Sequence, residues 1–171
     1  MAVDNPNPEI KHICHRESVQ LQNAEVPLRK RIFEIIRDIR DPEHPHTLEE
    51  LSVLDEDSVV VTDPDLPACR TYGLVHVSFT PTVPHCSLAS LIGLCIRTKI
   101  KQSDILPPGY KLDVSVVEGT HSTDKEITKQ LNDKERVSAA LENAKLREMV
   151  RECIEYDASS YSQQDVISSM G

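Results

Sequence analysis

The sequence is poor in aromatic residues: it has no tryptophan, two phenylalanines and four tyrosines. Because single-stranded nucleic acids stack on aromatic rings, this composition offers them few platforms. The charge points the same way, since nineteen basic residues against twenty-eight acidic ones give a formal net charge of −9. Contact with a phosphate backbone relies on cationic side chains. The sequence therefore argues against a nucleic-acid-binding protein.

Long uncharged apolar stretches are also missing, and so is an apolar run at the N-terminus. A membrane-spanning helix needs about 20 mostly apolar residues, so we expect no contact with a membrane. The five cysteines are an odd number, which does not suit a framework of disulfides. These features predict a soluble protein of a reducing compartment, with the cytoplasm and the nucleus as the candidates.

Several catalytic motifs are absent as well. The chain has no phosphate-binding loop, no dinucleotide-binding glycine pattern, no paired-histidine metalloprotease helix and no nucleophile elbow. A nucleotide-driven or cofactor-dependent enzyme is therefore unsupported.

The sequence does contain enough chain, 171 residues, for one domain with a hydrophobic core. Residues 1–26 show no sustained apolar period and are predicted to be a flexible N-terminal arm. Residues 27–156 are predicted to form the domain, and residues 157–171, rich in Ser, Gln and Asp, a flexible C-terminal tail. A His and Cys cluster at residues 12–15 is either incidental or a metal site, but no second ligand pair follows at zinc-site spacing.

Apolar periodicity predicts two helices at the start of the domain. The first begins at Pro27 and stops at Asp41, because a residue before proline is pushed out of the helical region. A short second helix is expected at Thr47, which fits a capping box with Glu50.

Three segments have the composition and alternation of strands, at residues 58–62, 74–79 and 111–117. With helices before, between and after them, these segments predict an α+β fold in which a small, mixed three-stranded sheet is packed with helices.

Further helices are expected in the rest of the domain. One opens near Ser87 with Cys95 on its apolar face, and the last carries Cys153 on its own apolar face. Both thiols are predicted to belong to the core. Thr123 and Asn132 each precede a glutamate by three positions and are predicted to begin helices.

Cys86 is the main candidate for chemistry, because it lies between a predicted strand and a predicted helix. Unpaired backbone N–H groups and the positive dipole end of a helix start favour a thiolate. His85 precedes it directly, and His121 follows the strand at 111–117. If the two strands are neighbours, their ends meet, and the Cβ atoms of His121 and Cys86 should lie within about 10 Å for direct contact.

Three roles are open for this group. Cys86 could act as a nucleophile activated by a histidine, which also needs an oxyanion pocket and an orienting group. It could be a thiolate ligand for zinc, iron or a cluster, although a single cysteine makes a poor permanent site. It could also be a small buried residue that caps the helix.

A set of longer motifs resembles one family. These are RDIRDPEHP at residues 37–45, TLEEL at 47–51, TPTVPHCS with SLIGLC between residues 80 and 95, EGTHST at 118–123 and QLNDKERVSAALEN at 130–143. They resemble, in the same order, the cytosolic iron–sulfur assembly component 2 family over roughly residues 27–155.

The resemblance implies an iron–sulfur cluster assembly domain-like fold and a protein that is not an enzyme. It implies an adaptor of the cytosolic iron–sulfur targeting complex, which works with a propeller (WD-repeat) scaffold and a helical-repeat adaptor. Its clients are iron–sulfur apo-proteins of the cytoplasm and nucleus, and chromosome segregation is affected through them. The family also forms homodimers by domain swapping, and the proline-bounded segment before Cys86 is a candidate hinge.

The resemblance also implies which residues matter. The reactive cysteine of the family corresponds to Cys86, and the wider superfamily's site corresponds to Asp41, Glu43, Thr82 and Cys86. The resemblance implies no tightly bound cofactor. It implies transient binding of an iron–sulfur cluster or zinc by Cys86. The alternatives are that Asp41 only caps the first helix, and that the whole protein is a Cys86-dependent hydrolase or transferase or a metal-free interaction module.

Overall fold

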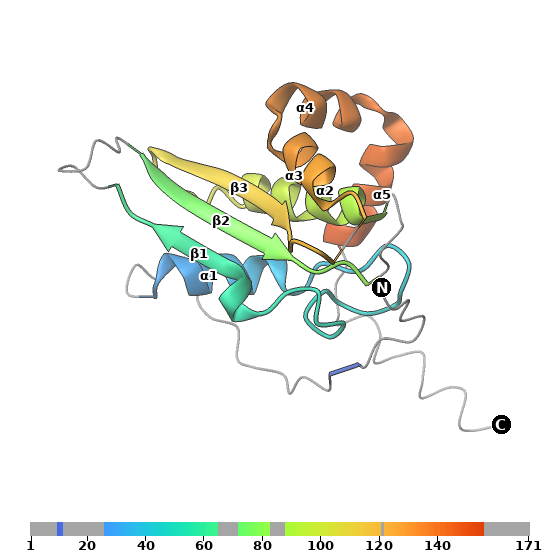
Figure 1. Cartoon of the computed structure of the whole chain (residues 1–171), viewed down its shortest axis with the longest axis horizontal. Helices are drawn as coiled ribbons and strands as arrows, with labels where there is room; N and C mark the ends of the chain where they lie inside the picture. The colour runs from blue at the N-terminus through green and yellow to red at the C-terminus, as the bar shows by residue number, and fades with distance from the viewer. Residues whose placement is uncertain (1–9, 12–25, 65–71, 83–87, 121, 156–171) are drawn as a thin grey trace.

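The computed structural model describes residues 10–11, 26–64, 72–82, 88–120 and 122–155 of the chain. It has an α+β fold, a three-stranded mixed sheet packed with helices, which confirms the predicted class (Figure 1). In chain order the elements are α1 (Leu28–Ile36), the 3-10 helix η1 (Glu56–Ser58), β1 (Val59–Thr62), β2 (Gly73–Phe79), α2 (Leu88–Gln102), β3 (Tyr110–Val116), α3 (Asp124–Asn132), α4 (Lys134–Glu142) and α5 (Ala144–Ile154). None of the described helices is long and apolar enough to cross a membrane.

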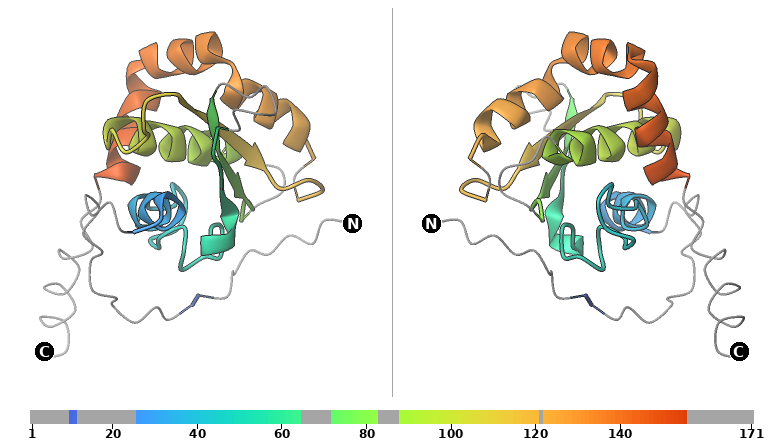
Figure 2. Two further views of the ribbon diagram at one scale, coloured as in Figure 1. Left: turned by 90° about the vertical axis from the view of Figure 1, so that its left-hand side faces the viewer. Right: turned by 90° about the vertical axis from the view of Figure 1, so that its right-hand side faces the viewer.

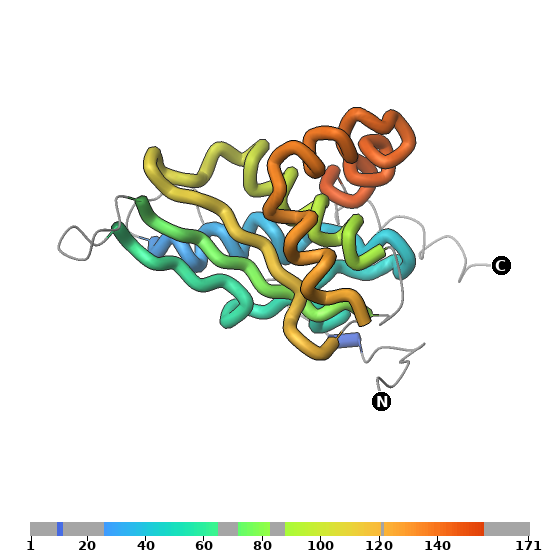
Figure 3. Tube along the Cα trace, turned by 45° about the horizontal axis from the view of Figure 1, so that its top comes forward, coloured from blue at the N-terminus to red at the C-terminus, as the bar shows by residue number. Residues whose placement is uncertain are grey.

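The sheet has the strand order β1-β2-β3, with β1 antiparallel to β2 and β2 parallel to β3 (Figure 3). All three strands lie where the sequence predicted them, to within a residue at either end. Parallel neighbours need a crossover connection, and α2 lies within it. The C-terminal ends of β2 and β3 therefore meet at one edge, where the Val117 N–H donates to the Phe79 carbonyl at 2.9 Å. The prediction that these two strands run side by side is confirmed.

One face of the sheet forms part of the hydrophobic core. Figure 2 shows the sheet nearly edge-on, with α1 and α2 on the same side of it. The residues that point to this side are buried, as the alternation of the strands requires: Val59, Val75, Val77, Phe79, Val114 and Val116. The opposite face is more polar and half-buried, and Val60 on it is 51% exposed.

The first helix is shorter than predicted. Its apolar face is buried as expected, but α1 ends at Ile36 instead of continuing to Asp41. The chain leaves the helix because other backbone partners compete: the Leu48 N–H donates to the Ile39 carbonyl at 2.8 Å, and Arg40 forms an antiparallel bridge with Thr47.

The second predicted helix does not form, although its capping box does. The Thr47 N–H donates to the Glu50 carboxylate at 2.8 Å, and the Glu50 N–H donates to the Thr47 hydroxyl at 3.3 Å. The chain then makes turns and passes through Ser52 at a φ of 59°, which is not helical for an L-residue. The capping box thus forms a turn here, and no helix follows it.

α2 and α3 approach closely at Gly93. A Cβ atom at this position would lie 2.3 Å from one methyl group of Leu131 and 2.7 Å from the other. Leu131 is only 2% exposed, so its side chain has little room to move away. The glycine therefore sets the spacing between the two helices.

We expect Gly93→Ala to lower the free energy of unfolding by about 1–3 kcal/mol through overpacking. This loss should occur even though alanine is favoured over glycine in a helix by ~1 kcal/mol. If the clash with Leu131 is the cause, Leu131→Ala should lower the free energy of unfolding by less in the Gly93→Ala background than in the wild type. Urea unfolding of the four proteins of this double-mutant cycle measures the coupling. The control is Ser138→Ala, at an exposed helical position, which should be neutral or stabilising. If the losses of unfolding free energy from Gly93→Ala and Leu131→Ala simply add, the proposed contact is wrong.

The C-terminal helices begin at different residues from those predicted. Asn132 ends α3, and the N-cap of α4 is Asp133, whose carboxylate accepts the N–H groups of Glu135 and Arg136 at 3.0 and 3.3 Å. The prediction of Asn132 as a cap was wrong by one residue, because its side chain bonds instead to β3. Thr123 is the N-cap residue of α3 as predicted, but its side chain makes no capping hydrogen bond.

Candidate functional site

Asp41 and Glu43 lie in the connection between α1 and η1, residues 37–55. Backbone hydrogen bonds hold this connection both internally and against α5. The Asp41 N–H donates to the His46 carbonyl at 2.9 Å, and the Arg40 N–H donates to the Cys153 carbonyl of α5 at 3.0 Å. The second bond brings the C-terminal helix to the residues that the sequence singled out.

The Asp41 side chain is 3% exposed and closes a tight turn. One of its oxygens accepts the N–H groups of Glu43 and His44 at 2.9 and 3.0 Å. This turn lies beyond the end of α1, so the alternative that Asp41 caps the first helix is wrong. The other carboxylate oxygen and Nε2 of His44 are buried without a hydrogen-bond partner in the part of the chain that the structure describes. Unpaired buried polar atoms are costly, which makes them candidates for binding a ligand.

These side chains open onto a pocket of about 260 Å³, which we call the Asp41 pocket. Its lining residues are Arg40, Asp41, Pro42, Glu43, His44, Pro45, Glu152 and Cys153. Carboxylate, imidazole and thiol groups thus meet in one hollow. Even so, within the described ranges no three His, Cys, Asp or Glu side chains are arranged to hold a metal ion.

Thr82 follows the end of β2 and is half-buried beside the buried Pro81. The segment leading to it is tied to the Asp41 connection, because the Thr80 N–H donates to the Val53 carbonyl at 3.0 Å. Thr82 does not line the Asp41 pocket itself. The structure therefore brings Asp41 and Glu43 together, and places Thr82 on a segment attached to the same connection.

The other three predicted site residues, His85, Cys86 and His121, lie outside the described residues. So does the cluster at residues 12–15. The strands that lead to Cys86 and His121 are parallel neighbours, but the distance between these two side chains stays a prediction.

Sequence reasoning missed Cys153 as a pocket residue. It was assigned to the core, and it is buried, as is Cys95. What the sequence did not predict is the hydrogen bond between the Cys153 carbonyl and Arg40, two residues more than a hundred positions apart. Only the position of Cys153 at the edge of an apolar stripe, next to Glu152, offered a signal.

A second polar arrangement crosses the open face of the sheet. Nδ1 of His76 lies 2.8 Å from an Asp113 oxygen, and its Nε2 lies 3.1 Å from the Ser115 hydroxyl. The order of groups is that of a Ser-His-Asp triad. However, an oxyanion hole needs free N–H groups near the serine, and those of Val114 and Val116 already donate to side chains of α3. These two N–H groups therefore cannot form an oxyanion hole. We assign the His76 arrangement the role of joining β2 to β3.

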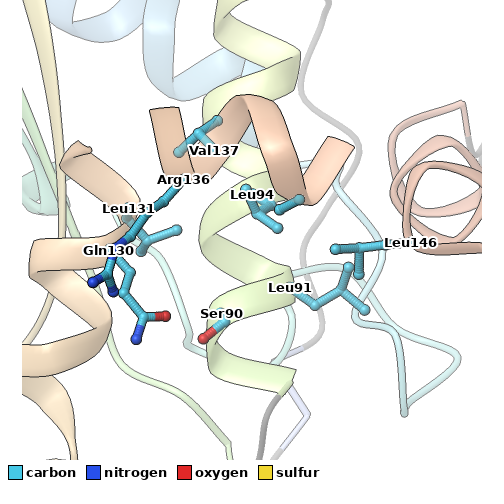
Figure 4. Close-up of a pocket in the computed structure, with 9 residues that line it drawn as sticks. Ser90, Leu91, Leu94, Gln130, Leu131, Arg136, Val137 and Leu146 are labelled. Carbon is cyan, nitrogen blue, oxygen red and sulfur yellow. The ribbon is translucent and has the colours of Figure 1, made fainter. Parts of the chain in front are cut away.

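Another hollow, of about 290 Å³, lies between α2 and the C-terminal helices. Figure 4 shows Leu91 and Leu94 of α2 facing Leu131, Val137 and Leu146. Its lining is mainly aliphatic, with no thiol or carboxylate. It is therefore unsuited to the chemistry considered for Cys86.

Comparison with known proteins places the chain in a class. A family model described as "Iron-sulfur cluster assembly protein" matches residues 29–105. The chain is 46% identical over 157 residues to the MIP18 family protein galla-2 of Drosophila melanogaster, which covers 89% of this chain and 95% of that protein. It is 45% identical over 157 residues to cytosolic iron–sulfur assembly component 2B of Mus musculus, covering 89% and 91%. It is 56% identical over 123 residues to protein AE7 of Arabidopsis thaliana, covering 72% and 73%.

The chain has the fold and the sequence pattern of the iron–sulfur cluster assembly proteins. Within this class it belongs to the MIP18 family, whose members include proteins named cytosolic iron–sulfur assembly component 2B. The family resemblance drawn from the sequence motifs is confirmed.

Proposed function

We propose that this protein is a component of cytosolic iron–sulfur assembly, an adaptor that helps deliver iron–sulfur clusters to apo-proteins and catalyses no reaction of its own. What supports the proposal is the similarity to proteins named cytosolic iron–sulfur assembly component 2B, which extends over most of both chains. The same names support a place in the cytosol, and we extend it to nuclear clients and, through them, to chromosome segregation.

The proposed partners are a propeller scaffold, a helical-repeat adaptor and the client apo-proteins. The cluster is the cargo of the protein and not its resident cofactor. A carrier needs only transient contact with its cargo, so we propose no permanent metal site. Cys86 is the proposed contact, with zinc as an alternative occupant, and His85 and His121 as its proposed neighbours.

We propose that the Asp41 pocket is a second binding region, in addition to Cys86. Its buried carboxylate oxygen and imidazole nitrogen without partners suit a polar group from a client or from the complex. A carboxylate near a thiol raises the pKa of that thiol, so Asp41 would not activate Cys86 directly. We therefore propose binding, not activation, as the role of Asp41 and Glu43.

The test replaces the protein in cells by the wild type, Cys86→Ala, Asp41→Asn or the control Cys69→Ala, which changes a cysteine outside all the family motifs. Captured partners are read by mass spectrometry, and radioactive iron measures cluster content in the clients. We expect the wild type and Cys69→Ala to recover the scaffold and to load clients fully. Cys86→Ala should keep the scaffold while client iron falls several-fold. Recovery of no scaffold by the wild type would overturn the proposal.

A further inference from the structure

Two thiols that the proposed function does not use lie together in the core. Cys95 of α2 is 0% exposed and Cys153 of α5 is 5% exposed, and both are free. The two thiols lie where α5 packs along α2, and their interaction shifts the pKa of each. A pair of thiols in contact can form a disulfide if the backbone brings the Cα atoms within about 7 Å of each other.

The backbone around Cys153 is held in place. Its carbonyl accepts the Arg40 N–H at 3.0 Å, and the next carbonyl, of Ile154, accepts the Lys99 ammonium of α2. Lys99 lies one turn of α2 beyond Cys95, so this contact fixes the last turn of α5 beside the turn that carries the other thiol. The helix turns that carry the two thiols are thus held side by side in the folded protein.

The two thiols differ in reactivity. The hydrogen bond with Cys153 raises the pKa of the Cys95 thiol, and burial raises it further. The same hydrogen bond lowers the pKa of Cys153, although burial and Asp41 oppose this. Cys153 therefore ionises first, with Cys95 as the donor to its thiolate. Cys153 also lines the Asp41 pocket, which gives a small oxidant a path to the sulfur.

We propose that Cys95 and Cys153 are an oxidative modification site, at which hydrogen peroxide forms an intramolecular disulfide between α2 and α5. The Cys153 thiolate attacks peroxide, the O–O bond breaks, and a sulfenic acid and hydroxide form. The Cys95 sulfur then attacks the sulfenic sulfur, the S–O bond breaks, and water leaves with the Cys95 proton. Two thiols lose two electrons, and one peroxide becomes two waters.

The bond would link α2, which begins just after the segment that holds Cys86, to a wall of the Asp41 pocket. It would close a loop that contains β3, α3 and α4. Such a cross-link reduces the freedom of the unfolded chain, so the oxidised protein should melt at a higher temperature than the reduced one. The inference depends on these two thiols alone and not on the proposed function.

The test uses the full chain with the other three cysteines replaced, Cys14→Ser, Cys69→Ser and Cys86→Ser. The reduced protein is treated with peroxide, then unfolded and alkylated with N-ethylmaleimide. We expect a mass loss of about 2 Da, for two hydrogens, no alkylation until a reductant is added, and one cross-linked peptide that contains both residues. Two alkylated thiols after treatment of the folded protein would overturn the inference.

Two further variants separate the two steps. With Cys95→Ala added, Cys153 should stop at the sulfenic acid, which dimedone traps; with Cys153→Ala added, Cys95 should not react with dimedone. The same oxidation in guanidinium chloride is the control for folding. A disulfide that forms as fast in the unfolded chain as in the folded one would overturn the inference, because the folded contact would then contribute nothing. Circular dichroism checks that each variant is folded.

Discussion

Replacing Arg37 by alanine is expected to lower the free energy of unfolding by about 3–5 kcal/mol, because it leaves two shielded carboxylates without their counter-charge. The guanidinium lies 3.2 Å from Glu34 and 2.8 Å from Glu49, and the three side chains are 10%, 11% and 17% exposed. Since a domain of this size is stable by only about 5–15 kcal/mol, the loss is a large share of the total. Urea unfolding monitored by circular dichroism measures it.

Arg151→Ala is the matched control. Arg151 pairs with Glu148 at 2.8 Å, but the two side chains are 58% and 53% exposed, so the change should cost less than about 0.5 kcal/mol. A third variant tests the cause: Arg37→Met combined with Glu34→Gln and Glu49→Gln removes the charges together and should be more stable than Arg37→Met alone. If Arg37→Ala costs no more than Arg151→Ala, the shielded network is not a source of stability.

The Arg37 network also matters for the candidate site. Glu49 lies after Asp41 in the connection between α1 and η1, and its N–H donates to the Arg37 carbonyl at 3.4 Å. The arginine thus holds the far side of the connection against the end of α1. We expect Arg37→Ala to loosen the turn around Asp41 as well as to destabilise the fold.

The sequence was sufficient to predict the sheet and the core. The three valines of β1 and the alternation of Val75, Val77 and Phe79 identify strands, because burial on one face imposes a period of two. Cys95 and Cys153 were correctly assigned to the core from their positions on apolar helical faces. These patterns are local, so no tertiary information was needed.

The errors arose where pairing with another segment of the chain decides the local structure. α1 ends at Ile36 because Ile39 pairs with Leu48, and the propensity of the residues between contains no sign of that pairing. Asn132 fits a capping box with Glu135, yet its amide bonds to Val114 of β3, 18 residues earlier in the chain. The contact between the Asp41 connection and Cys153 belongs to the same kind, and no local pattern predicts it.

Asn132→Ala is expected to lower the free energy of unfolding by about 2–4 kcal/mol, because two backbone groups of β3 lose their partners together. The Asn132 oxygen accepts the Val114 N–H at 3.0 Å, and its nitrogen donates to the Val114 carbonyl at 2.9 Å. The same side chain also accepts from Arg97 and donates to the Thr128 carbonyl. It thus pairs with the outer edge of the described sheet as another strand would.

Asn143→Ala is the control for this change, since Asn143 is the exposed N-cap of α5 and should cost about 1 kcal/mol. Urea unfolding compares the two variants, and equal losses of unfolding free energy would contradict the role given to Asn132.

The position of Asn132 at the edge of the sheet leads to a second expectation. An uncovered strand edge offers N–H and C=O groups to another chain. Light scattering should then detect more self-association for Asn132→Ala than for Asn143→Ala.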